Sequence, residues 1–336
     1  MEINIKKAIL HVLDSNTSVP VISNKELDIS SGGVSDFLIK HIEKINNDAA
    51  AKRGEFKDTG DNPVLNQILK LIENEDEFVY STIEISNVLF NLMLKHIDIP
   101  AADLVFCIVE VESRYYLAIL KMNYRESYTH FVENGDDGLQ NQLIKHRTIL
   151  PSDSQRIEEG AVISLEDYSI RLVEKACEID GEKKNYFSEL FLKCKTDLSK
   201  RETLKIINKA AQDISHKYYD DRFEKMAEVK SVICELAEED GDFEIDRLAE
   251  SVFKDSKEIQ DEYKEQVYKA GISSKVSMDA SYVEKRVMTQ KLKTDTGIEI
   301  NFPSTIYNNK EMLEFINNPD GTISILIKKI NKITSR

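Results

Sequence analysis

The sequence predicts an α+β fold: an N-terminal mixed domain with a sheet centred on a β-hairpin and amphipathic helices, then a helical region, then a small C-terminal antiparallel β region. Two continuous apolar runs rich in branched side chains, residues 104–111 and 115–122, predict the central hairpin, because such strands are typical of a buried sheet. Apolar residues at helical spacing on either side predict the helices. Two turn sequences near the C-terminus predict two further hairpins.

The other N-terminal elements follow from local signals. Asn62 before Pro63 predicts the start of one helix, since asparagine is a good N-cap and proline suits the first helical position. Ser81 with Glu84 matches a capping box and predicts the start of the next helix. Further strands are expected at residues 3–13, 19–27 and 128–132, and a further helix at residues 34–45.

Helical periodicity returns from Tyr168 onward. Ser199 with Glu202 forms a second capping box before a long amphipathic helix, and another helix is expected at residues 259–267. The C-terminal hairpins are expected at residues 287–302 and around the Asn-Pro-Asp-Gly turn at residues 318–321.

The length of 336 residues predicts two domains, because single cores seldom grow past roughly 250–300 residues. The expected boundaries are 1–160 for the N-terminal α+β domain, 165–284 for the helical region and 285–336 for the C-terminal β-hairpin region, which we expect to form one domain with the helical region. With 41% hydrophobic and 31% charged residues, the composition is typical of soluble globular proteins. The chain has no apolar run of about 18 residues and no signal-peptide pattern, which excludes a membrane span and predicts a cytoplasmic location.

Charge is distributed unevenly along the chain. Residues 1–250 carry 31 Lys and Arg against 48 Asp and Glu, whereas residues 251–336 carry 14 against 12. The net charge of −15 repels a polyanion at long range, so contact with DNA would require a local basic patch. The C-terminal segment is the part of the chain that we expect to supply this patch.

Residue types that carry enzyme chemistry occur without the necessary spacing. Four cysteines stand 17 or more positions apart and six histidines stand alone, so no zinc or other metal site is predicted. The Gly32-Gly33 segment lacks the Lys-Ser/Thr of a phosphate loop, and no G-x-S-x-G motif occurs. The acidic segment from Asp240 lacks the central glycine and final glutamate of a calcium loop. We therefore predict no catalytic residue, metal or cofactor, and a protein that is not an enzyme.

The candidate DNA-binding residues are basic side chains of the two C-terminal hairpins: Lys285, Arg286, Lys291, Lys293, Lys328, Lys329 and Lys332. Side chains two positions apart in a strand share a face, so Lys291 and Lys293 are expected to point the same way. If the two hairpins pair, their cations form one surface that contacts phosphates weakly and without sequence specificity. The alternative is that these lysines protect exposed strand edges from pairing with other chains.

Five segments, spread over nearly the whole chain, follow one another in a characteristic order. They are IKKAILHVLD, LDISSGG, DLVFCIVEVESRYYLAILKM, NYFSELFLKCKTDLSKRET and INNPDGTISILIKKINKI. In this combination the chain resembles the bacterial 37-kDa nucleoid-associated protein family, the NdpA-like proteins. The resemblance implies a cytoplasmic protein associated with the nucleoid, with no established reaction, cofactor or metal site. It transfers no agreed set of functional residues, so the lysines named above rest on charge alone.

Three functions from different classes remain open. The first is a non-enzymatic nucleoid-associated protein that binds DNA, directly or through a partner. The second is an acidic protein-interaction scaffold, or a partial DNA mimic, that binds a DNA-processing enzyme. The third is a metal-dependent nuclease whose acidic residues assemble only in the folded chain. Exposed hairpin edges and amphipathic helices are also compatible with a homo-oligomer.

Overall fold

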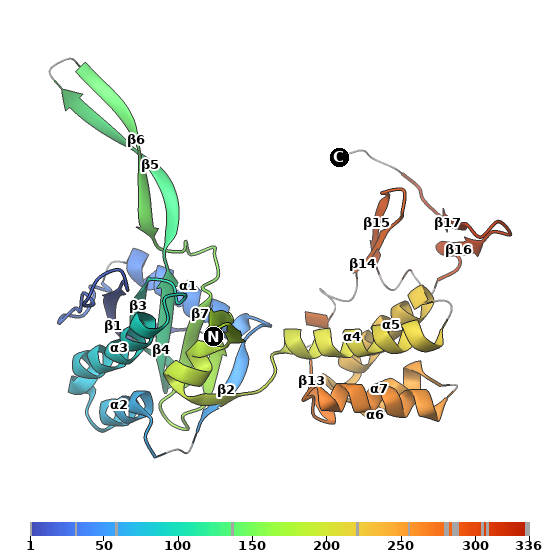
Figure 1. Ribbon diagram of the computed structural model, residues 1–336, viewed down its shortest axis with the longest axis horizontal. Coiled ribbons are helices and arrows are strands. Elements are labelled where there is room, and N and C mark those ends of the chain that lie inside the picture. The colour runs from blue at the N-terminus through green and yellow to red at the C-terminus, as the bar shows by residue number, and fades with distance from the viewer. Residues whose placement is uncertain are drawn as a thin grey trace. The chain divides into compact units, whose positions relative to one another are not determined.

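The computed structural model of the chain describes residues 2–30, 32–57, 60–135, 138–219, 222–254, 256–278, 282–283, 289–303, 306 and 309–332. The chain forms two compact units, residues 1–199 and residues 200–336, each with its own hydrophobic core. The predicted α+β fold is confirmed (Figure 1): the first unit is built on an antiparallel sheet with helices, and the second on helices followed by small hairpins.

The first unit is organised around a seven-stranded sheet in which all neighbouring strands are antiparallel. In spatial order the strands are β1 (Asn4–Leu13), β3 (Ala102–Val111), β4 (Arg114–Asn123), β7 (Glu159–Ser164), β8 (Ile170–Val173), β2 (Lys52–Phe56) and β11 (Cys194–Thr196). The predicted central hairpin is confirmed as β3 and β4, which pair along their whole lengths. Between them, Glu112 and Ser113 both have positive φ, as in the tight turns that match the twist of the strands.

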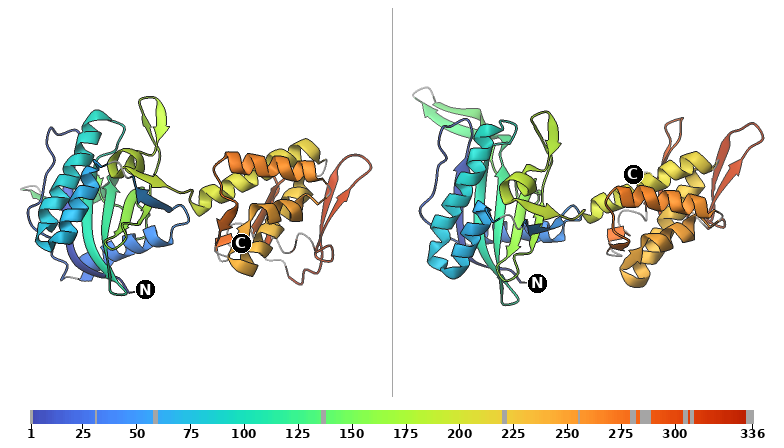
Figure 2. Two further views of the ribbon diagram at one scale, coloured as in Figure 1. Left: turned by 90° about the horizontal axis from the view of Figure 1, so that it is seen from below. Right: turned by 60° about the horizontal axis from the view of Figure 1, so that its bottom comes forward.

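Helices cover both faces of this sheet (Figure 1, Figure 2). α1 (Gly32–Asn47) packs on one face. The other face is covered by α2 (Pro63–Glu73), α3 (Phe78–Lys95) and the π-helical turn η2 (Phe187–Leu192), and the short η1 (Glu75–Glu77) joins α2 to α3. Successive residues of β3 enter opposite cores, Phe106 towards α3 and Cys107 towards α1, because side chains alternate across a strand. Burial on both faces explains the continuous apolar run that predicted this strand.

Local signals fix the start of one helix and misplace another. The Asn62 side chain accepts hydrogen bonds from the backbone N–H groups of Val64 and Leu65, at 3.1 and 3.2 Å, so the predicted cap of α2 is confirmed. The predicted start of α3 at Ser81 is wrong, because α3 begins at Phe78 and Ser81 is buried inside it. η1 leads directly into α3, so the chain is already helical before the capping box.

The segment after Tyr168 forms short strands rather than the expected helix. β8 is followed by the hairpin of β9 (Cys177–Ile179) and β10 (Glu182–Lys184), then by η2 and β11. Asp180 and Gly181 both have positive φ and make the tight turn of this hairpin. These strands have three or four residues each, which is too few to distinguish alternation from helical spacing. The first unit therefore continues past residue 160 to residue 199.

A long two-stranded arm projects from the first unit (Figure 1). It consists of β5 (Arg125–Gly135) and β6 (Gly138–Ile149), whereas the sequence predicted only a strand at residues 128–132. Every residue of β6 is exposed, and its apolar residues do not alternate regularly with polar ones. Pattern-based prediction depends on a buried face, so an exposed ribbon gives it no signal.

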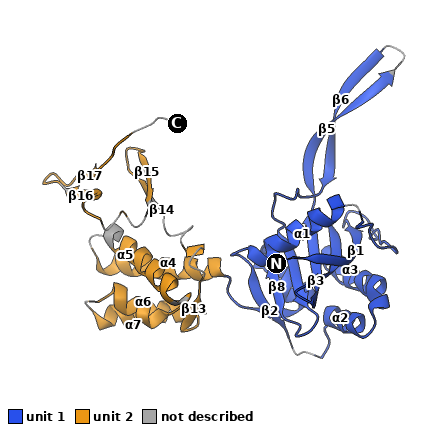
Figure 3. Cartoon of the chain, turned by 180° about the vertical axis from the view of Figure 1, so that it is seen from behind, with its two compact units in different colours: residues 1–199 blue, residues 200–336 orange. Residues whose placement is uncertain are grey.

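The second unit has a helical core followed by two hairpins (Figure 3). Its elements are α4 (Lys200–Tyr218), α5 (Arg222–Asp240), β12 (Asp242–Glu244), α6 (Ile245–Val252), α7 (Lys257–Lys269), β13 (Lys275–Ser277), β14 (Thr289–Lys293), β15 (Glu299–Pro303), β16 (Leu313–Asn317) and β17 (Ile323–Ile327). Both predicted C-terminal hairpins are confirmed, β14 with β15 and β16 with β17, and each is a separate two-stranded sheet. α4 begins directly after Ser199, where the second capping box predicted it. Within the described ranges, no helix is both long and apolar enough to span a bilayer.

His11 is a fully buried titratable group between β1 and α3. Its Nδ1 accepts a hydrogen bond from the Ser23 N–H at 3.2 Å, and its Nε2 lies 3.2 Å from Thr82 Oγ1. Nε2 therefore carries the proton of the neutral ring. Burial lowers the pKa of His11 to about 4, because the charged ring would lose its hydration.

This burial predicts a loss of stability in mild acid. The unfolded chain protonates His11 near pH 6.5, whereas the folded ring stays neutral down to about pH 4, so the unfolded state binds more protons between these values. The free energy of unfolding should fall by about 2 kcal/mol between about pH 7.5 and about pH 5 because of this residue. Urea denaturation of the wild type and of His11→Gln at both pH values measures this contribution. His130→Gln, on the exposed arm, is the control, and an unchanged pH dependence in His11→Gln would contradict the prediction.

Candidate nucleic-acid interface

The structure places three of the predicted lysines beside carboxylates of their own hairpins. The ion pairs are Lys293 with Glu299 at 3.2 Å, Lys328 with Glu314, and Lys329 with Glu311. All six side chains are at least a third exposed, and surface ion pairs contribute only about 0–1 kcal/mol each. A phosphate can therefore compete for these lysines, but each hairpin presents less free charge than its sequence suggested.

Of the other four predicted DNA-binding residues, the structure describes the side chain of one. Lys332 is exposed and has no ion-pair partner within the described ranges. Lys285, Arg286 and the side chain of Lys291 lie outside the described residues. Because the two hairpins are separate sheets, β-ladder pairing does not join their lysines into one surface.

The net charge is divided unequally between the two units. Residues 1–199 carry 22 Lys and Arg against 34 Asp and Glu, a net charge of −12. Residues 200–336 carry 23 against 26, a net charge of −3. The second unit therefore repels a polyanion much less than the first does.

α4 carries a second group of basic side chains, which our sequence analysis did not identify. The buried face of this helix includes Leu204, Ile207, Ala211 and Ile214, at the spacing that predicted an amphipathic helix. Arg201, Lys205 and Lys209 lie on the exposed side, and we call these three residues the α4 basic stripe. Residues four apart on a helix are neighbours on its surface, about 6 Å apart along the axis.

The cations of the α4 basic stripe are available to a ligand. Among the residues that the structure describes, no carboxylate forms an ion pair with Arg201, Lys205 or Lys209. The stripe extends about 12 Å along the helix, which corresponds to about three phosphates of one DNA strand. Phosphates can thus contact it without displacing a carboxylate. Three basic residues at four-residue spacing, opposite a clear apolar face, were the signal that could have identified it from the sequence.

α6 and α7 follow each other closely, in the order of a helix-turn-helix unit, whose second helix enters the major groove of DNA. The outer side of α7 is acidic, however. A depression of about 640 Å³ on it is lined by Glu258, Asp261, Glu262, Glu265, Gln266 and Lys269. Asp261, Glu262 and Glu265 form surface ion pairs with Lys264, Lys217 and Lys269. This side of α7 therefore has no excess of cations for phosphates, and the helix does not suit the groove. An acidic surface suits a basic partner instead.

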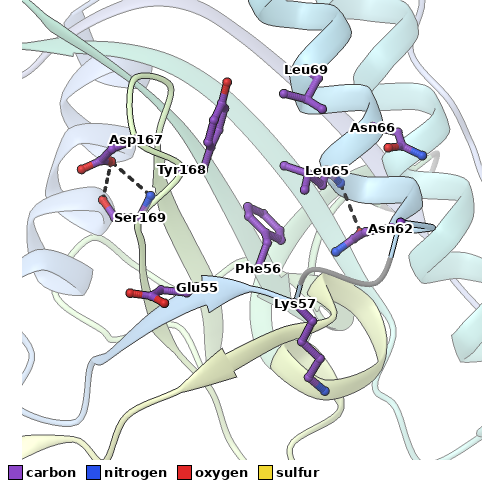
Figure 4. A pocket seen from close by; sticks show the side chains of 11 residues that line it. Glu55, Phe56, Lys57, Asn62, Leu65, Asn66, Leu69, Asp167, Tyr168 and Ser169 are labelled. Carbon is purple, nitrogen blue, oxygen red and sulfur yellow. Dashed lines mark hydrogen bonds between the residues drawn. The ribbon is translucent and has the colours of Figure 1, made fainter.

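The first unit has a pocket of about 570 Å³ between β2, the start of α2 and the turn between β7 and β8 (Figure 4). Two of its polar side chains serve the local fold. Asn62 caps α2 and also donates to the backbone oxygen of Leu192 at 2.9 Å. Hydrogen bonds from Ser164 and Ser169 lower the pKa of Asp167 to about 2, so this carboxylate is ionised at neutral pH. Since these groups already have partners, they give no reason to assign a ligand.

Lys121 is fully buried in β4. Its Nζ donates to the backbone oxygen of Pro100 at 3.0 Å and to Asn123 Oδ1, and lies 3.7 Å from Glu159 Oε2. Asn123 Nδ2 in turn donates to Glu159 Oε2 at 2.7 Å. Burial lowers the pKa of Lys121 to about 8. The network satisfies its members from within the chain, so we interpret it as structural.

Metal-ligating side chains do not converge in the described part of the chain, which contains no group of three His, Cys, Asp or Glu residues placed to hold an ion. The four cysteines are present as thiols. Cys107 and Cys194 are buried, and Cys177 and Cys234 are partly exposed. Burial raises the pKa of both Cys107 and Cys194 to about 12, so these two thiols stay protonated at neutral pH.

The chain thus combines an acidic α+β unit with a less acidic helical unit that carries exposed cations. A family model described as nucleoid-associated protein YejK (NA37) matches residues 9–334. The chain therefore belongs to this family of nucleoid-associated proteins, which confirms the family resemblance of its sequence segments. No match is found among curated proteins.

Proposed function

We propose that this non-enzymatic member of the family binds DNA directly, weakly and without sequence specificity, through basic side chains of its second unit. The observation that carries the proposal is the α4 basic stripe, whose three cations are exposed and without carboxylate partners in the described ranges. Contacts of this kind position a protein on the phosphate backbone and do not read bases.

The C-terminal hairpins contribute further contacts in this proposal. Lys293, Lys328 and Lys329 exchange their carboxylate partners for phosphates, since exposed ion pairs are weak. Lys332, with Lys285, Arg286 and Lys291 of the same segment, adds positive charge nearby in the sequence. The strongly acidic first unit is kept away from the DNA by repulsion. The protein would act in the cytoplasm, on the nucleoid, with no reaction, cofactor or metal.

A salt titration of DNA binding tests this function. Two labelled duplexes of equal length and unrelated sequence are titrated with the full chain between about 50 and about 300 mM salt, and binding is followed by fluorescence anisotropy. We expect the logarithm of the affinity to fall linearly with the logarithm of the salt concentration, by about 0.9 for each phosphate contact, and equally for both duplexes. Binding that is insensitive to salt, or that strongly favours one duplex, would contradict the proposal.

A second candidate function is supported by the acidic outer side of α7. In this case the protein is a scaffold or partial DNA mimic that binds the basic surface of a DNA-processing enzyme. This function would be favoured if the chain shows no salt-dependent affinity for DNA while excess duplex DNA releases it from such an enzyme.

A further inference from the structure

The β5–β6 arm carries large apolar side chains that the first unit leaves uncovered. The exposed ones are Tyr128, Phe131, Val132, Leu139, Leu143, Ile144 and Ile149. Leu139 and Leu143 are 75% and 78% exposed. An isolated two-stranded hairpin is only marginally stable in water, and exposed apolar patches commonly mark protein interfaces. The arm therefore has the properties of a surface that is covered by a partner.

The register of the arm places four of these side chains, Tyr128, Val132, Leu139 and Leu143, on one face of the ribbon. Tyr128 pairs with Lys145, His130 with Leu143, Val132 with Asn141, and Asn134 with Leu139. Partners across a ladder share a face, so these eight residues form one side of the ribbon, which we call the apolar face. The opposite face carries Phe131 and Ile144 among polar side chains, and there Gln142 donates to Glu133 at 2.6 Å.

The charge of the arm indicates what kind of partner covers it. Residues 125–149 contain three Lys and Arg against four Asp and Glu, so the arm lacks the excess of cations that DNA binding requires. The apolar face contains no acidic residue, and its lysine, Lys145, pairs with Glu126 at 2.6 Å. Such a face can lie on an acidic protein surface without like-charge repulsion. The first unit, with its net charge of −12, is a surface of that kind.

We propose that the arm holds a second copy of this chain, with the apolar face of each arm lying on the first unit of the other copy. Ten residue pairs at about 3.4 Å, across two strands about 4.8 Å apart, give the face an area of about 340 Å². One contact then buries about 700 Å² in total, whereas two exchanged arms bury about 1,400 Å², within the usual range of specific interfaces. The buried area therefore favours a complex in which both arms are exchanged over one that is held by a single contact of one arm.

The first unit offers exposed apolar residues to receive the arm. Val19 and Val21 are 69% and 65% exposed, and Ile97, just after α3, is 87% exposed. Reciprocal exchange gives closed two-fold symmetry, in which both copies make the same contacts and no further copies are added. The proposed complex is therefore a dimer, and it does not depend on the DNA-binding proposal.

Sedimentation of the full chain between about 1 and about 100 μM tests the dimer. The variant L139N/L143N changes the apolar face, and Q140S/Q142S changes the opposite face of the same strand and serves as the matched control. All four side chains are exposed, so neither variant should disturb the core. We expect the wild type and the control to be dimers and the L139N/L143N dimer to dissociate at an at least tenfold higher concentration.

Several results would overturn the proposal. They are a wild type that stays monomeric at about 100 μM, an L139N/L143N variant that dimerises as the wild type does, and an L139N/L143N variant that loses DNA affinity while its self-association is unchanged. The Leu143→Cys variant distinguishes the geometry. If the arms are exchanged, the two thiols that this substitution introduces into a dimer lie apart, and oxidation should form no disulfide between them. A disulfide between the two copies would indicate direct contact between the arms and would contradict the exchange.

Discussion

Replacing Arg201, Lys205 and Lys209 together by glutamine is expected to weaken binding to duplex DNA about 100-fold at about 0.15 M salt. Each lost phosphate contact removes the release of about 0.9 counterions, so three contacts change the logarithm of the affinity by about 2 at this salt concentration. The slope of log affinity against log salt should become shallower by about 2.7. Glutamine has nearly the helix propensity of lysine and arginine, so α4 should stay folded, and circular dichroism checks this.

Two comparison variants make the result specific to the α4 basic stripe. K293Q/K328Q/K329Q removes the ion-paired hairpin lysines and should cost less affinity, because each of these cations is already partly neutralised. Lys269→Gln with Lys275→Gln removes two other ion-paired lysines of the second unit and should have little effect. A larger loss in the hairpin variant than in the stripe variant would move the binding site to the hairpins. No loss in either variant would contradict direct binding by the second unit.

The substitution Lys121→Ala is expected to lower the free energy of unfolding by about 3–5 kcal/mol, because removing one partner of a buried ion pair leaves the other charge uncompensated. Glu159, only 2% exposed, would keep the hydrogen bond from Asn123 but lose the ammonium group 3.7 Å away. The backbone oxygen of Pro100 would lose its 3.0 Å donor as well. Urea denaturation of the full chain measures this loss of unfolding free energy. The unfolding transition of the first unit, which contains Lys121, is followed separately from that of the second unit.

The neighbouring surface pair provides the control for this prediction. Lys175 lies 3.0 Å from Glu158 but is 65% exposed, so Lys175→Ala should cost less than about 1 kcal/mol. Combining Lys121→Met with Glu159→Gln removes both charges and should recover part of the stability that Lys121→Ala loses. If Lys121→Ala costs less than about 1 kcal/mol, the buried network does not stabilise the fold as we infer.

The sequence predicts those elements of this fold whose patterns reflect burial or a specific turn. β3 and β4 are buried on both faces, and their continuous apolar runs identified them. Asn62 with Pro63 fixed the start of α2 because the cap acts locally. β2 was missed because its sequence, Lys-Arg-Gly-Glu-Phe, is mostly polar and owes its place to neighbouring strands. β6 was missed because an exposed ribbon carries no pattern of burial.

In the candidate site, too, the sequence predicts local features but not the contacts that form only in the folded chain. The basic character of the hairpins was evident from the sequence, but Lys328 meets Glu314 and Lys329 meets Glu311 only because of how the folded segment is arranged. Charge counted along the chain cannot show such neutralisation. The α4 basic stripe, in contrast, follows from helical spacing alone.

The β5–β6 arm affects how tightly this protein, with the proposed weak DNA-binding site on each copy, can bind a long DNA molecule. A pair of chains joined through exchanged arms would present two copies of α4 to the same nucleic acid. Once one copy is attached, the second meets phosphates at a high effective concentration, so avidity can exceed the affinity of either copy by a large factor. Long chromosomal DNA would then retain the pair, whereas short fragments that engage only one copy would release it readily.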